Sequence, residues 1–83
     1  MYKYEEVKPN LFTDEGQRQF LKVRDFVKHA LDLAGAVRMQ EVMQAAGAGD
    51  SWTMMACVDR LVELEEIREI PQNNVAGQYR IFV

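Results

Sequence analysis

Residue types that commonly carry catalysis, disulfides or metal sites are scarce in this 83-residue chain, which has one cysteine, one histidine and two prolines. The single Cys57 cannot form an internal disulfide, a pattern typical of the reducing cytoplasm. No apolar run approaches the length of a membrane span, and the N-terminal residues lack the apolar core of a signal peptide. We therefore expect a cytoplasmic protein without a membrane segment.

The scarce reactive residues do not form a recognisable site. His29 has Asp25 and Asp32 as helical neighbours, which is typical of a surface pair. Cys57 has no basic neighbour to lower its pKa, which indicates a buried, inert thiol. One histidine and one cysteine cannot supply a zinc ligand set, and the glycines in residues 47–49 follow a helix, which indicates a turn. The sequence predicts no enzyme, metal, cofactor or small-molecule ligand.

Length and charge limit the possible classes of protein. The chain has room for one small domain, and its 48% hydrophobic and 28% charged residues are typical of a globular protein. Its net charge is −3. Because nucleic-acid-binding domains usually carry a basic patch, this balance argues mildly against a polyanionic partner. A local basic patch can nevertheless exist on a chain that is negative overall.

Turn signals divide the chain into an arm, residues 1–12, and a domain, residues 13–83. Pro9 breaks any early helix in the arm, whereas Tyr2 and Tyr4 are apolar enough to pack. In the domain, we expect a helix from Thr13 or Asp14 to Ala34, ended by Gly35. We expect a short strand at 36–38, a helix at 39–46, a turn at 47–49, a helix at about 51–65, and a hairpin with strands at 68–72 and 78–83.

The helix at 51–65 carries the clearest pattern, because its apolar residues recur in steps of four, three and three and so form one stripe. They are Met54, Val58, Leu61 and Leu64. The chain then runs without a proline into Ile67 and Ile70, which are typical of a strand. The fold class predicted from these patterns is mainly α with a small β-hairpin, α+β.

This order of elements, with Thr53-Met54, Val58, Leu61, Leu64 and Ile67 at these spacings, resembles the winged-helix superfamily of bacterial regulators over residues 13–83. The resemblance implies a winged helix-turn-helix of three helices and a C-terminal wing. The helix at 51–65 would be the recognition helix, and the hairpin at 68–83 the wing. Two positions depart from the pattern: Glu65 stands where many members have glycine, and Ala56 where many have a basic residue.

The first functional hypothesis is a DNA-binding transcription regulator, with the recognition helix in the major groove and the wing on the backbone. The residues expected at that interface are Arg38, Ser51, Trp52, Thr53, Met55, Arg68 and Arg80. The residues expected on base edges include no strong base reader such as arginine or asparagine; they are Ser51, Trp52, Met55, Ala56 and Asp59. With only Arg38, Arg68 and Arg80 on phosphates, a monomer would bind weakly, so this hypothesis implies a homodimer. Across the hairpin, Arg68 and Arg80 are expected to be neighbours.

The second hypothesis is a protein-interaction module that does not bind DNA, with a partner surface made of Trp52, Met55, Asp59 and Glu63. Trp52 lies about 200° around the helix from Met54, away from the core stripe. It either folds back on a methionine of its own motif or forms an exposed anchor for a partner. The sequence is compatible with both interpretations.

The helix at 13–34 raises two further expectations. Phe26 and Leu33 are one heptad apart, so they either pack under the arm with Tyr2 and Tyr4 or form a dimer seam together with Tyr4. Across the whole chain, Arg38, Arg68 and Arg80 included, the basic residues are either phosphate contacts or solvated charges, several of them paired with Asp25, Asp32 or Glu69. For the basic residues of this helix, solvated charge is the better explanation. Those basic residues are Arg18, Lys22, Arg24 and Lys28.

Overall fold

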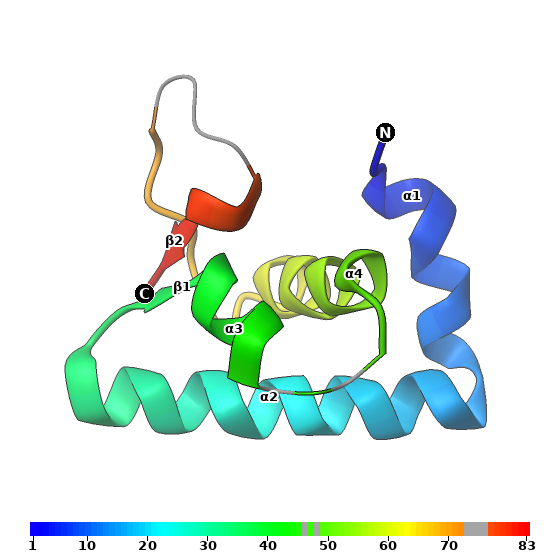
Figure 1. The fold of residues 1–83 in the computed structure, drawn as a ribbon, viewed down its shortest axis with the longest axis horizontal. Helices are drawn as coiled ribbons and strands as arrows, with labels where there is room; N and C mark the ends of the chain where they lie inside the picture. The colour runs from blue at the N-terminus through cyan, green and yellow to red at the C-terminus, as the bar shows by residue number, and fades with distance from the viewer. Residues whose placement is uncertain (46, 48, 73–76) are drawn as a thin grey trace.

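The computed structural model describes residues 1–45, 47, 49–72 and 77–83. Its elements are α1 (Tyr4–Val7), the 3₁₀ helix η1 (Lys8–Phe12), α2 (Asp14–Ala34), β1 (Val37–Arg38), α3 (Met39–Ala45), α4 (Ser51–Glu63), the 3₁₀ helix η2 (Gly77–Tyr79) and β2 (Ile81–Phe82) (Figure 1). The predicted class, mainly α with a small antiparallel sheet, is confirmed. Ala46, the predicted end of the second helix of the domain, and most of the predicted hairpin loop lie outside the described residues.

Helix α2 forms the base of the molecule, and local signals set both of its ends (Figure 1). The Thr13 side chain caps the helix by accepting a hydrogen bond from the Gly16 N–H at 3.0 Å. Gly35 ends it in the left-handed region, with a φ of 75°. Both predicted ends are confirmed. Val23 and Val27 are fully buried and carry the inner face of the helix.

Helix α4 ends two residues earlier than the sequence predicts, in a hydrogen-bonded reversal of the chain. The Glu65 N–H bonds the Val62 carbonyl at 2.9 Å, and the Glu66 N–H bonds the Leu61 carbonyl at 3.0 Å. These are the two bonds of a Schellman cap, and they hold Glu65 at a φ of 61°. The reversal turns Leu64, a predicted core residue, towards the surface, where it is 43% exposed.

In the sheet, β2 lies between two neighbours. On one side it pairs with β1, Val37 opposite Phe82. On the other, Phe82 bridges Glu69, and Arg68 and Val83 exchange two backbone hydrogen bonds of 2.8 Å. The return strand is shorter than the predicted 78–83, because residues 77–79 are helical.

The register also corrects the expected pairing of the wing arginines. Arg68 is opposite Val83, whereas Arg80 is three residues before Val83 along the chain. Since successive strand residues point to opposite faces, Arg68 and Arg80 lie on opposite faces of the sheet and are not cross-strand neighbours.

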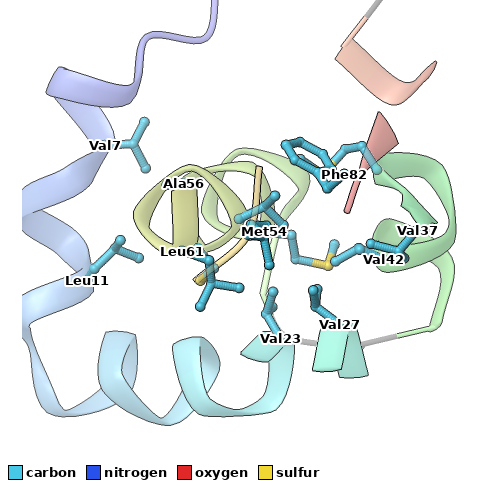
Figure 2. Packing of buried hydrophobic residues seen from close by; sticks show 14 residues of the cluster. Val7, Leu11, Val23, Val27, Val37, Val42, Met54, Ala56, Leu61 and Phe82 are labelled. Atoms are coloured by element: carbon cyan, nitrogen blue, oxygen red, sulfur yellow. The ribbon is translucent and has the colours of Figure 1, made fainter. Parts of the chain in front are cut away.

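Side chains from every layer meet in one core between α2, α4 and the sheet (Figure 2). Phe82 is its largest fully buried residue, and Leu61 of α4 is equally inaccessible. Cys57 is also fully buried, and this burial raises the pKa of its thiol to about 12. The predicted burial of Cys57 is therefore confirmed. None of the helices in the described part of the chain is long and apolar enough to cross a membrane.

The positive φ of Glu65 makes a specific prediction for stability. A side chain in the left-handed region costs about 1–2 kcal/mol, a cost that glycine does not have. After allowing for the greater freedom of glycine in the unfolded chain, we expect Glu65→Gly to raise the free energy of unfolding by about 0.5–1 kcal/mol. The measurement is urea unfolding followed by circular dichroism.

Glu65→Ala is the matched control, because it removes the same charge but retains a Cβ atom. A comparable gain in this control would show that the carboxylate, and not the backbone conformation, lowers the stability of the wild-type chain.

Candidate interaction surface on helix α4

Helix α4 has two faces, and each packs against another part of the protein. Its inner face packs in the core through residues such as Val58 and Leu61. Its outer face, half a turn away, carries Trp52, Ala56 and Asp59, followed one turn later by Glu63. The sequence predicts that this outer face is open to a partner. In the structure Ala56 is fully buried and Asp59 is half-buried, so the middle of the outer face is covered, whereas Trp52 and Glu63 at its two ends are exposed.

The cover is residues 1–12, which we call the N-terminal segment. Both of its short helices, α1 and η1, pack on α4, and Val7 and Leu11 are buried beside Ala56 and Leu61 (Figure 2). The sequence predicts an arm in which Pro9 breaks any helix. Instead, Pro9 lies in the first turn of η1, a position that proline tolerates because its missing N–H would have no helical partner there.

A compact turn fixes the N-terminal segment to α2. Gly16 is buried so closely against the Asn10 carbonyl that no Cβ atom would fit there. The Thr13 hydroxyl donates to the same carbonyl at 2.9 Å, and the Gln17 amide donates to the Leu11 carbonyl. These contacts make the segment an integral part of the fold.

Asp59 joins the N-terminal segment to the hairpin. Its carboxylate accepts hydrogen bonds from the Tyr2 hydroxyl and from the Arg80 guanidinium, both at 2.6 Å. Arg80 also binds Glu69 at 2.8 Å and lies over the Phe82 ring, 5.1 Å from its centroid. The side chains of Asp59 and Arg80 are only 15% and 19% exposed. The arginine predicted to contact phosphate is therefore held between two carboxylates of its own chain.

The protonation states of this cluster follow from its contacts. Burial, and then the hydrogen bond to Asp59, raise the pKa of Tyr2, so its hydroxyl remains a donor. Burial lowers the pKa of Arg80, but the bonds to Glu69 and Asp59 outweigh this effect and raise it above its ordinary value. Arg80 is therefore positively charged at any physiological pH.

Glu63, one turn further along α4, is the second attachment point. Its carboxylate accepts hydrogen bonds from Tyr4 at 2.8 Å, Lys8 at 2.9 Å and Arg60 at 2.6 Å. Hydrogen bonds from Lys8, Tyr4 and Arg60, in that order of size, lower the pKa of Glu63 to about 2. Two of its three partners belong to the N-terminal segment.

Glu66 attaches the end of α4 to the base of the molecule. It binds Lys28 at 3.0 Å and Arg24 at 3.4 Å, both on α2. The hydrogen bond from Lys28 is the main cause that lowers the pKa of Glu66. Arg24 and Lys28 thus pair with Glu66, which the sequence does not predict, whereas Glu69, one of the predicted partners, pairs with Arg80 of the hairpin.

Trp52, the one aromatic residue of α4, is 46% exposed. Its ring meets the Tyr2 ring edge-on, with centroids 6.3 Å apart and planes at 67°. The predicted alternatives were a neighbour within its own motif and an exposed anchor. The observed aromatic neighbour comes from the N-terminal segment, and about half of the indole stays open. Of the other expected contact residues, Ser51 is exposed and Met55 is half-buried.

The residues of the predicted dimer seam lie on two different elements. Tyr4 belongs to α1 and donates its hydroxyl to Glu63 of α4. Phe26 is half-buried against the core, whereas Leu33 is 76% exposed at the far end of α2. The hydrogen bonds of Tyr2 and Tyr4 attach the N-terminal segment to α4. The sequence suggests that Tyr2 and Tyr4 pack over Phe26 and Leu33 of α2. In the structure, the hydroxyls of both tyrosines instead bond carboxylates of α4.

Most of the positive charge is neutralised inside the molecule. Of the ten lysines and arginines, six form salt bridges. In the described residues, the four without one are on separate elements. They are Lys3, Lys22, Arg38 and Arg68.

No family model matches the chain, and no curated protein or solved structure is significantly similar to it. Within the described part of the chain, no group of three or more histidine, cysteine or acidic side chains could hold a metal ion.

The close packing of Gly16 against the Asn10 backbone predicts that replacing this helical glycine by alanine lowers stability, the opposite of the usual effect. In a helix, alanine is normally more stable than glycine by up to about 1 kcal/mol. Here a Cβ would collide with the Asn10 backbone, so we expect Gly16→Ala to lower the free energy of unfolding by about 1–3 kcal/mol. Urea unfolding gives this value, with Lys22→Ala on the exposed side of α2 as control. An unchanged or higher stability would mean that the segment does not pack at this distance.

The lowered pKa of Glu63 predicts how stability depends on pH. Its value in the folded state, about 2, is below the ordinary 4.5, so the stabilisation is complete above the ordinary value and is lost as pH falls towards 2. We expect Glu63→Gln to be less stable than the wild type at neutral pH and to lose less stability on acidification. Thermal unfolding across this range measures both.

The matched control is Glu5→Gln, an exposed glutamate on α1. If this control flattened the acid dependence as much as Glu63→Gln, attachment through Glu63 would not be its cause.

Proposed function

We propose that this chain is a winged helix-turn-helix domain that acts as a protein-interaction module and does not read duplex DNA. The scaffold part of the proposal rests on the order of α2, β1, α3 and α4 followed by a hairpin, with β2 as the middle strand of the sheet. In this assignment α4 is the recognition helix, and residues 68–83 form the wing.

The cover on α4 is the observation that carries the functional part. A recognition helix enters a major groove about 12 Å wide, and the side chains that contact the base edges must not be covered by another part of the protein. Here the middle of the outer face of α4 lies beneath the N-terminal segment, and Ala56 is fully buried. Reading DNA through this face would require Val7 and Leu11 to leave their contacts with α4.

Electrostatics support the same conclusion. Affinity for DNA depends on how many phosphates the protein neutralises, at about one unit of salt dependence for each. Of the three arginines first expected on phosphates, Arg80 is bound to Asp59 and Glu69, which leaves Arg38 and Arg68. Two contacts on a chain of net charge −3 would give weak, nonspecific binding.

A protein partner fits the exposed part of α4 better. Tryptophan is enriched among the residues that dominate binding energy at protein interfaces. Trp52 is about half exposed, and its edge contact with Tyr2 holds the indole in place. An anchor that is already ordered loses less conformational entropy when a partner binds.

The DNA side of the proposal is tested by fluorescence anisotropy of a labelled random duplex at about 50 and 200 mM salt. We expect no binding in the micromolar range at either concentration, from a sample shown by circular dichroism to be folded. Micromolar binding that weakens steeply with salt would overturn the proposal and restore the DNA-binding regulator as the better function.

The protein side is tested by capture of partners from an extract of the source cells, with Trp52→Ala compared against Leu33→Ala. Both variants remove an exposed apolar side chain. We expect capture to be lost only in Trp52→Ala, whose stability should fall by about 1 kcal/mol because an aromatic pair is lost. Equal capture by both variants would remove Trp52 as the anchor.

A further inference from the structure

The outer face of the sheet is a second surface with a definite chemical character. The inner face carries Val37 and Phe82, which are 1% and 0% exposed. Cross-strand partners share a face, so Arg38 and Ile81, which pair with each other, point outwards together. The Ile70 N–H bonds the Ile81 carbonyl at 2.9 Å, which places Ile70 on the same outer row.

The next row of the outer face is the pair of Arg68 and Val83. The two rows together put Ile81 and Val83 on the middle strand, Ile70 beside Ile81 on the edge, and one arginine at each of two diagonally opposite corners. Ile70 is 39% exposed, Ile81 and Val83 are half-buried, and both arginines are exposed. We call this set the outer sheet patch. It comprises Arg38, Arg68, Ile70, Ile81 and Val83.

The two arginines of the patch are the only guanidinium groups in the described residues that form no salt bridge. Glu41 lies near Arg38, but its carboxylate accepts the Arg38 backbone N–H at 3.2 Å. The other four arginines each have a carboxylate partner within the chain. In a molecule of net charge −3, two free arginines beside exposed aliphatic residues are complementary to a partner that is both apolar and acidic.

The shape of the patch indicates what covers it. A sheet with apolar residues on both faces is stable when each face packs against another layer, most often a helix. The core occupies the inner face, whereas the described residues supply no helix for the outer one. An open hollow of about 620 Å³ continues from the patch towards the end of α4. It is lined by Val62, Ile67, Arg68 and Val83 and by three glutamates, Glu65, Glu66 and Glu69, so the acidic groups of a partner would have to lie on the patch side of Arg68.

We propose that the outer sheet patch binds an acidic amphipathic helix of a partner protein. Apolar residues at i, i+3 or i+4 of that helix would cover Ile70, Ile81 and Val83, and flanking carboxylates would form bidentate pairs with Arg38 and Arg68. This inference rests on the proposed function, since it names a partner class for a protein-interaction module. DNA is a poorer match, because the aliphatic centre of the patch offers nothing to phosphates.

The test uses a synthetic helical peptide with leucines on one face and glutamates on both flanks, titrated into ¹⁵N-labelled protein. We expect amide shifts confined to β1, β2 and residues 68–70. A matched peptide with lysine in place of each glutamate should bind at least about tenfold more weakly, because its positive charges repel both arginines.

Matched variants separate the patch from general charge effects. The double variant Arg38→Gln, Arg68→Gln should weaken binding of the acidic peptide at least about tenfold, whereas Lys22→Gln on α2 should leave it unchanged. The single variants are used if the double variant fails to fold in a thermal scan. Unchanged affinity in a folded double or single variant would overturn the inference.

The outcomes also separate this inference from the proposed function. Shifts centred on Trp52 instead of the patch would overturn the sheet site and leave the protein-interaction function intact. Shifts at Arg38 and Arg68 with a DNA duplex, and none with either peptide, would overturn both. No shifts with the acidic peptide at millimolar concentration would overturn the sheet site alone.

Discussion

The structure depends on the packing of α4 between two layers, α2 on its inner side and the N-terminal segment on its outer side. A chain of 83 residues has little surface to bury, and a central helix buried on two sides uses that surface efficiently. This arrangement explains why Ala56, on the outer side, is as inaccessible as Leu61 on the inner side. It also explains the small side chain at position 56, because η1 and α1 approach the helix closely there.

The acidic residues of α4 and of the cap that follows it are the electrostatic half of the same arrangement. Carboxylates near the C-terminus of a helix are unfavourable to its dipole, by some tenths of a kcal/mol each. Here Asp59, Glu63 and Glu66 bind cations or hydroxyls from the hairpin, the N-terminal segment and α2 respectively, so each acid joins α4 to another part of the fold. Their tertiary partners offset the local cost, which a helix in isolation would not recover.

Local signals could be read from the sequence, and contacts between distant residues could not. Thr13 and Gly35 mark the ends of α2 because capping depends on neighbouring residues. The end of α4 that the sequence predicts is two residues too late, because a glutamate, and not a glycine, adopts the left-handed conformation at position 65. The role of Arg80 depends on Asp59, 21 residues earlier in the chain, and the burial of Ala56 depends on the N-terminal segment, whose Tyr2 bonds Asp59 across 57 residues. No periodicity reports such contacts.

The free energy needed to move the N-terminal segment off α4 determines how tightly this helix could bind DNA. Burial of a side chain such as Val7 or Leu11 contributes about 1.5–3 kcal/mol, so uncovering both would cost about 3–6 kcal/mol before any polar contact is counted. A binding-competent state at that energy lowers the apparent affinity by a factor of roughly 10² to 10⁴. Nonspecific DNA binding typically has a Kd of about 10⁻⁴ to 10⁻⁶ M, so even the favourable end of this range would lie at or beyond 10⁻⁴ M. A partner that uses Trp52 or the outer sheet patch meets no such cost, because both surfaces are already open in the folded chain.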